Sequence, residues 1–279
     1  NLTAENVQNL GGRISGTDVG VQARNDLNNL GGSVTASSSL AATAGRDLKV
    51  ITTTRTQGNA QGSRTNIDRV AGLYVTGANG TLLAAAGRDL QLDAAAILNS
   101  APTGATAGST TLAAGRDLKL GVASESASSH IVWDAANQRT DASRTDIGTT
   151  IQTQGDIRLQ AGGDLNAKAA NVSSDKGAVL ATAAGSVKLS AGEANVQSDA
   201  AHQRTGKSLF SSQTISSRDT LDQTTALGST FSGHTTTVLA NQDIKLQGSN
   251  VVSTQGTVLA AQNNITIEAA KNTKTESHL

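Results

Sequence analysis

Aspartate residues recur along this sequence at places where they could bind a metal ion. Each stands directly before a short aliphatic segment, and most follow a glycine. They are Asp47, Asp89, Asp117, Asp164 and Asp243. Carboxylates stacked along a sheet can share a hard cation such as Ca²⁺. The calcium-binding pattern Gly-Gly-x-Gly-x-Asp is absent, however, and Arg or Lys stands near most of these aspartates. We therefore expect them to cap turns and to pair with Arg46, Arg88 and Arg116, and we predict no metal site.

The histidines and aromatic residues offer the other candidate chemistry. His130 and Trp133 share the segment Ser-His-Ile-Val-Trp-Asp, which could contact a partner or a sugar because an indole ring stacks on apolar faces. Tyr74, Phe210 and Phe231 are the remaining aromatics and complete the candidate contact surface. The simpler interpretation is that Trp133 covers an apolar patch where a hairpin leaves the main body.

Catalytic motifs are missing from the sequence. No nucleophile or second acid stands at a fixed spacing from His130, so we predict no catalytic residue. Glycine-rich phosphate loops, nucleophile elbows and metal-binding helix motifs are also absent, and we expect no cofactor.

Composition disfavours several other classes of protein. The 279 residues contain 22 Lys+Arg and 22 Asp+Glu, and this zero net charge gives no positive field for nucleic acid. No run of Lys and Arg favours an anionic membrane surface, and no apolar stretch approaches the roughly 18 residues of a membrane-spanning helix. The chain has no Cys, which fits export through oxidising compartments, and no Met, which indicates a segment of a larger protein.

Two nested periods run along the chain. The motif Gly-Arg-Asp-Leu-x-Leu/Val begins at Gly45, Gly87 and Gly115. Looser copies extend it to the C-terminal part, and the basic step is about 20 to 22 residues. The step across the Pro-containing loop at 99–104 is longer. A longer period of about 70 residues separates Leu48, Leu118, Val187 and Ile265.

A unit this short predicts one turn of a parallel β-helix. Each unit holds short segments with alternating apolar and polar residues, separated by Gly, Asn, Asp and Ser. Such segments form a sheet only if each pairs with its equivalents one turn above and below. We expect the aliphatic pairs to face inward and Lys49, Lys119, Lys188 and Lys245 to face water. The inward pairs are Leu48/Val50, Leu90/Leu92, Leu118/Leu120, Val187/Leu189, Ile244/Leu246 and Ile265/Ile267.

Three polar insertions interrupt the regular units, at about 51–72, 121–152 and 197–237. Ser63-Arg64-Thr65-Asn66-Ile67 in the first returns as Ser143-Arg144-Thr145-Asp146-Ile147 in the second. Their β-branched, polar arms predict hairpins. A strand that is polar on both faces is marginal alone, so we expect the hairpins to extend the sheet.

The repeated Ala-Gly-Arg-Asp-Leu-x-Leu units, together with the segments 242–249 and 260–272, resemble the haemagglutinin repeats of bacterial two-partner-secretion exoproteins. That group includes the filamentous haemagglutinins and the contact-dependent growth-inhibition effectors. The resemblance covers most of the chain outside the insertions. It implies an all-β, right-handed parallel β-helical shaft that is exported through an outer-membrane pore and displayed on the bacterial cell surface.

The resemblance also implies a function. The sequence lacks the N-terminal secretion domain, the toxin domain and the Arg-Gly-Asp motif of such proteins. We expect residues 1–279 to form one repetitive, non-catalytic segment that contacts a host cell or a neighbouring bacterium, in adhesion or in toxin delivery. The alternative is a β-helical polysaccharide-degrading enzyme. Such an enzyme gathers acids, basic residues and aromatics in one groove, whereas here the acids are spread by period.

Overall fold

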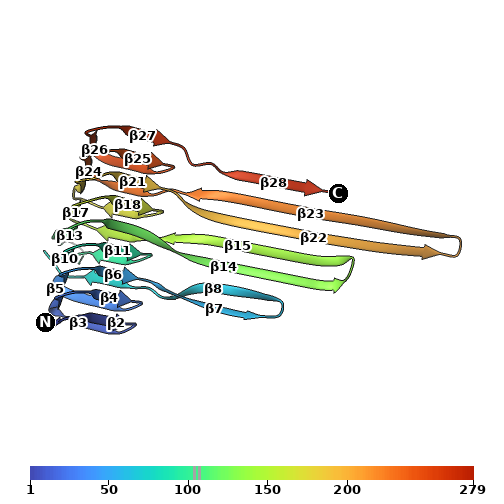
Figure 1. The fold of residues 1–279 in the computed structure, drawn as a ribbon, viewed down its shortest axis with the longest axis horizontal. Coiled ribbons are helices and arrows are strands. Elements are labelled where there is room, and N and C mark those ends of the chain that lie inside the picture. The colour runs from blue at the N-terminus through green and yellow to red at the C-terminus, as the bar shows by residue number, and fades with distance from the viewer. Residues whose placement is uncertain (103–104, 106–107) are drawn as a thin grey trace.

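The computed structural model describes residues 1–102, 105 and 108–279, and these residues form strands without any helix (Figure 1). Residues 103 and 104 of the loop expected at 99–104 lie outside the described residues. The chain forms a coiled shaft with long hairpins that project from one side of it (Figure 1). The all-β prediction is confirmed.

Each turn of the shaft has three sides, and its strands follow one another along them. The first side comprises β2 (Val7–Leu10), β4 (Leu27–Leu30), β6 (Leu48–Ile51), β11 (Leu90–Asp93), the start of β14 (Leu118–Asp134), β18 (Leu165–Lys168), β21 (Val187–Ser190), β25 (Ile244–Gln247) and β27 (Ile265–Glu268). The second side comprises β9 (Gly72–Val75), β12 (Ala96–Asn99), β16 (Thr150–Thr153) and β19 (Asn171–Ser174). The third side comprises β1 (Leu2–Ala4), β10 (Thr81–Ala86), β13 (Thr110–Ala114), β17 (Ile157–Ala161) and β20 (Val179–Ala183). Four longer strands run along both the second and third sides: β3 (Arg13–Ala23), β5 (Ser33–Ala44), β24 (Thr230–Ala240) and β26 (Asn250–Ala261).

Strands of successive turns pair in parallel and in register. On the first side, Leu48 pairs with Leu90, and Leu90 pairs with Leu118. The same column continues through Leu165 and Val187 to later turns. Parallel pairing of equivalent short strands is the pattern expected for a β-helix, whose handedness stays a prediction.

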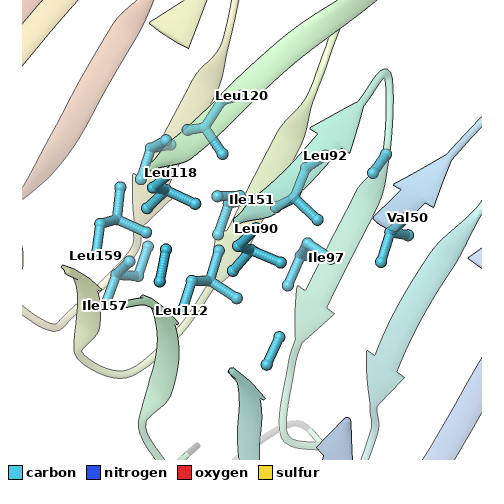
Figure 2. Packing of buried hydrophobic residues seen from close by; sticks show 14 of the residues in the cluster. Val50, Leu90, Leu92, Ile97, Leu112, Leu118, Leu120, Ile151, Ile157 and Leu159 are labelled. Atoms are coloured by element: carbon cyan, nitrogen blue, oxygen red, sulfur yellow. The ribbon is translucent and has the colours of Figure 1, made fainter. Parts of the chain in front are cut away.

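The core is a continuous aliphatic column. Leu90 and Leu92 of β11 are fully buried, as are Ile97 of the second side and Leu112 of the third. Figure 2 shows these side chains converging from the three sides of the turn with those of neighbouring turns. Burying one such side chain contributes roughly 1.5–3 kcal/mol. The predicted inward orientation of the aliphatic pairs is confirmed for every turn but one, and Lys119, Lys188 and Lys245 are exposed while Lys49 is half-buried.

The exception is the turn that contains Ile265 and Ile267, which were predicted to be buried. They pair in register with Ile244 and Leu246, so their strand continues the column. Ile265 is nevertheless 45% exposed, because β27 is the outermost strand of this side and no layer of the described chain covers it.

The predicted turn aspartates form a ladder between turns. At the corner between the third and first sides, Asp47 accepts a hydrogen bond from the backbone N–H of Asp89, and Asp89 accepts one from Asp117. Arg88 pairs with Asp47 of the preceding turn, with its Nε 2.8 Å from the carboxylate. This hydrogen bond holds the pKa of Asp47 below its usual value. The aspartates therefore cap backbone groups as expected, but those of the next turn rather than of their own.

The opposite corner, between the first and second sides, has two forms. Turns without an insertion close it tightly with a residue at positive φ, such as Gly31 at 62°, Ala94 at 47° or Ala169 at 48°. Every second turn from β6 onward opens at this corner into a hairpin. The hairpins, here called the arms, are β7 (Thr53–Asn59) with β8 (Gly62–Arg69), the distal part of β14 with β15 (Asn137–Gly148), and β22 (Gly192–Ser208) with β23 (Ser211–Leu227).

The prediction for the third insertion was wrong at both ends. It was expected at 197–237, but the third arm spans 192–227, and Thr230–Ala240 is the shaft strand β24. A Thr-rich strand with period-2 alternation has the same pattern in an arm as in the shaft, so the sequence did not separate them. The first two insertions, expected at 51–72 and 121–152, match arms at 53–69 and 122–148.

Candidate functional site

The arms join into one antiparallel sheet, here called the arm sheet. Its strand order is β7-β8-β14-β15-β22-β23-β28, where β28 (Thr273–His278) follows the last turn of the shaft. Neighbouring arms meet through the pairs β8 with β14 and β15 with β22. The expectation that the hairpins extend a sheet, rather than stand free, is confirmed.

The spacing of the arms follows from the dimensions of β-structure. Neighbouring strands lie about 4.8 Å apart, so a hairpin is roughly 9.6 Å wide, and two turns of the shaft rise by the same amount. One hairpin on every second turn therefore places each arm beside the last. This match explains the 70-residue period, which contains two turns and one arm.

Buried hydroxyl groups secure the corner where each arm leaves the shaft. Thr149 donates from Oγ1 to the carbonyl of Leu92 at 2.7 Å and accepts from the N–H of Ala95 at 3.3 Å. Thr52 donates to the carbonyl of Ala94 in the armless turn, and Ser229 accepts the N–H of Ala170 in another armless turn; each also bonds one backbone group of its own turn. All three are buried, and these bonds connect each arm base to the neighbouring armless turn.

A buried carboxylate joins two arms to the shaft. The Asp146 side chain is 2% exposed and lies 2.8 Å from Lys168 Nζ on β18 and 2.8 Å from Ser124 Oγ. It also accepts the N–H of Glu193 at the base of the third arm. Burial alone would raise the pKa of Asp146, but hydrogen bonds from Lys168 and Ser124 outweigh it and keep this pKa below its usual value. Asp146 is therefore ionised at neutral pH and positions the arm bases.

The predicted contact residues His130 and Trp133 both lie on the second arm. Trp133 is 59% exposed, close to the two-residue turn of this arm, and its ring centroid lies 6.2 Å from that of His202 on the third arm. It therefore does not cover a patch where the arm leaves the shaft, and the simpler interpretation was wrong. His130 is exposed and bonds the hydroxyl of Thr140 through Nδ1.

The other predicted contact residues are divided between the arms and the shaft. Phe210 is 98% exposed at the turn of the third arm. Phe231 is fully buried in β24 of the shaft and cannot contact a partner, which corrects the prediction. Tyr74 is half-buried on β9, its ring folds back over Gly72, and burial raises its pKa. The structure thus places His130, Trp133 and Phe210 on the arm sheet, and the other two aromatics away from it.

Sequence reasoning missed three residues of this region: His202 and Leu209 on the arm sheet, and the buried Asp146 at its base. The ring of His202 on the third arm lies beside that of Trp133 on the second arm. No local pattern in the sequence indicates which strands of the arms are neighbours. Leu209 stands beside Phe210 and is 92% exposed. Its signal was present, because a Leu-Phe pair in a polar Ser-rich hairpin is unusual. No group of three or more His, Cys, Asp or Glu residues within the described chain could hold a metal ion.

The sequence model of the hemagglutinin repeat family matches residues 134–214 and 210–278, which together make up more than half of the chain. The chain belongs to the hemagglutinin repeat family. In this hemagglutinin-repeat chain, the first match begins near the turn of the second arm and ends just past the turn of the third. The family unit therefore corresponds to the long period of two turns and one arm.

The other comparisons add no relative. Neither the search of curated proteins nor that of solved structures found a match. Within the residues that the structure describes, this hemagglutinin-repeat chain contains no helix that is long and apolar enough to cross a membrane.

Proposed function

We propose that this chain is a non-catalytic β-helical segment of a secreted bacterial surface exoprotein, and that the arm sheet is its contact surface. The shaft, taken as right-handed, would hold the arm sheet away from the cell that displays it. The observation that carries the proposal is the arm sheet itself: three arms and β28 lie side by side on one side of the shaft, with both faces largely exposed.

The composition of the arm sheet supports a contact role. A single-layer sheet with little apolar burial gives little stability to the fold, so long arms are hard to explain as scaffold alone. The second and third arms present side chains suited to recognition, such as Trp133 and His202. Repetition along the sheet would allow several weak contacts to act together.

The family membership supports the setting of the proposal. We propose export through an outer-membrane partner pore and display at the cell surface, where the chain meets a host cell or a neighbouring bacterium. Adhesion is the role we favour, because the regular arms form a broad surface for multivalent contact. A more specific form of the proposal is that the same shaft supports toxin delivery, which requires a toxin domain elsewhere in the parent protein.

The arrangement of acids gives no support to the polysaccharide-degrading alternative. In the described residues, the recurring corner aspartates accept hydrogen bonds from backbone N–H groups of the following turn, and Asp47 and Asp89 also pair with arginines. The acids are thus distributed along the shaft, whereas a glycosidic bond is cleaved between two facing carboxyl groups.

The test is to remove one arm and measure attachment. Beads coated with the full chain should bind target cells. A variant in which 191–229 is replaced by the two-residue corner Ala-Ala, as at Ala169–Ala170, should bind several-fold more weakly while its circular dichroism shows a folded β-shaft. The matched control carries Leu83→Ala on an exposed face of the shaft and should bind as the original chain does. Equal binding by the armless variant and the original would refute the proposal.

A further inference from the structure

Within the described residues, the third arm extends beyond its neighbours as a two-stranded ribbon. Pairing between β15 and β22 ends at Gln138 with Ala201, and pairing on the other side ends where Arg218 of β23 exchanges two backbone hydrogen bonds with Leu279. Beyond these pairs, the two strands pair only with each other as far as Ser208 and Ser211. Figure 1 shows this ribbon reaching farther from the shaft than any other part of the molecule.

The turn at the end of this ribbon is apolar and almost fully exposed. Leu209 is 92% and Phe210 is 98% exposed. The other arms provide an internal comparison, because they also end in two-residue turns, made of Ala60–Gln61 and Ala135–Ala136. Since small or polar residues suffice for the same turn, folding does not require Leu-Phe at this position.

The charges around this turn are all positive. Arg204 and Lys207 are exposed and are the only charged residues between Asp199 and Arg218. Asp199 is itself paired with Arg218. The hairpin therefore places two basic groups close behind the apolar turn without a neighbouring acid, although the sequence contains no run of basic residues.

We propose that Leu209 and Phe210 insert into the interface of a lipid bilayer and that Arg204 and Lys207 contact its phosphate headgroups. This inference rests on the proposed function, because it assigns a partner to the same arm sheet. Exposed Leu and Phe side chains gain free energy in the headgroup and acyl boundary, and basic side chains behind them can remain at the polar surface.

The backbone limits how deep the ribbon enters. Beyond Gln203 the edge of β22 carries unpaired N–H and C=O groups, which cannot enter hydrocarbon without a large cost. Only the turn is therefore inserted, while Ser208, Ser211 and Ser212 remain among the headgroups. A binding pocket on a receptor protein would instead be expected to contact the flanks of the ribbon, which here carry mainly Ser, Thr, Gln and Gly.

The experiment is flotation of the full chain with lipid vesicles. The probes are vesicles of phosphatidylcholine alone and vesicles in which roughly one-third is phosphatidylglycerol. We expect binding to both, and tighter binding to the second. Leu209→Ala/Phe210→Ala should weaken binding at least about tenfold, because it removes two inserted side chains. This variant creates the Ala-Ala turn that the second arm already contains, so it should fold.

Two further variants make the assignment specific. Arg204→Gln/Lys207→Gln should reduce binding to the anionic vesicles more strongly than binding to phosphatidylcholine, because the two side chains lose the attraction to net negative charge as well as their phosphate contacts. The matched control Ile131→Ala/Val132→Ala removes exposed apolar surface from the second arm and should bind as the original chain does. In a Trp133→Phe background, the emission of Phe210→Trp should shift to the blue when vesicles are added, because the indole leaves water.

Three outcomes would overturn the inference: no binding of the original chain to either vesicle, unchanged binding of Leu209→Ala/Phe210→Ala, or an equal loss in the Ile131→Ala/Val132→Ala control. Attachment to cells that depends on the third arm, without vesicle binding, would refute the lipid partner and leave the proposed contact function standing. Vesicle binding without arm-dependent attachment to cells would refute the contact function instead.

Discussion

Deleting a single armless turn should break the arm sheet, because the arms stay side by side only when two turns separate them. Removal of 165–186 joins Asp164 to Val187 and eliminates the turn made of β18, β19 and β20. The third arm then leaves the shaft about 4.8 Å above the second, instead of about 9.6 Å. At that height the third arm would have to occupy the position of β15.

The expected loss can be worked from the pairing between β15 and β22. Eight residue pairs, from Gln138 with Ala201 to Thr145 with Ala194, join these strands. In an antiparallel ladder this corresponds to about eight hydrogen bonds, each contributing roughly 0.5–1.5 kcal/mol net. The deletion should therefore remove about 4–12 kcal/mol of interaction between the second and third arms, in addition to one turn of core.

Hydrogen exchange measured by mass spectrometry is the suitable assay. In the 165–186 deletion, the amides of β22 that donate to β15 should exchange rapidly, while the shaft strands remain protected. The matched control deletes 118–186, which removes two turns together with the second arm. The third arm then follows the first at the normal distance, and Asn195–Ser198 should be protected by β8. If β22 were as well protected in the single-turn deletion as in the original chain, the argument that the width of one hairpin must equal the rise of two turns would be refuted.

Three other predictions concern the shaft and the arm bases. Leu118→Ala leaves a cavity in the aliphatic column and should lower the free energy of unfolding by about 2–5 kcal/mol in a denaturant titration, whereas the exposed Leu83→Ala should change it by less than about 0.5 kcal/mol. Asp146→Asn removes the charge that Lys168 faces and should cost about 1.5–3 kcal/mol at pH 7. Because the pKa of Asp146 is lowered by folding, its contribution is present above about pH 4 and is lost as the pH falls through the lower folded-state value, so the difference between variant and original should shrink in acid. Ala94→Gly should raise the midpoint of thermal unfolding, because Ala94 has a φ of 47° and glycine adopts this conformation without strain.

Opposite results would identify the faulty step in each case. A Leu118→Ala variant as stable as Leu83→Ala would mean that the column is not a packed core. A stability difference for Asp146→Asn that grows on acidification would contradict the lowered pKa. Destabilisation by Ala94→Gly would show that the unfolded-state entropy of glycine outweighs the relief of strain at this corner.

The shaft could be predicted from the sequence because every turn repeats the same pattern of aliphatic, polar and corner residues. Alternating residues such as Leu90 and Leu92 face a common core, and Gly and Asp mark the corners. Equivalent strands meet in register, so the pattern of one turn predicts its neighbours. The Arg and Asp ladder was only half predicted, because partners one turn apart are separated by 20 to 41 residues.

The arm sheet was harder to predict in detail. Its strands are polar on both faces, so no hydrophobic pattern indicates which strands pair or where an arm returns to the shaft. Phe231 was therefore assigned to an insertion although it is a core residue of β24. The contact between Trp133 and His202 depends on how two arms align, which is decided by the heights of their bases on the shaft.

The first arm also shows how the arm sheet is bounded. The two preceding turns close their corners with Gly11 and Gly31, both at positive φ. Arg69 at the base of the first arm lies over both glycines and donates to the carbonyl of Gly11 at 3.0 Å. A side chain at Gly31 would lie 2.9 Å from the Cβ of Arg69, whereas one at Gly11 would only displace the flexible end of Arg69; the positive φ favours glycine at both corners. Its outer strand β7, Thr53–Asn59, contains no large apolar residue and carries Arg55, features that discourage unintended pairing at an exposed sheet edge.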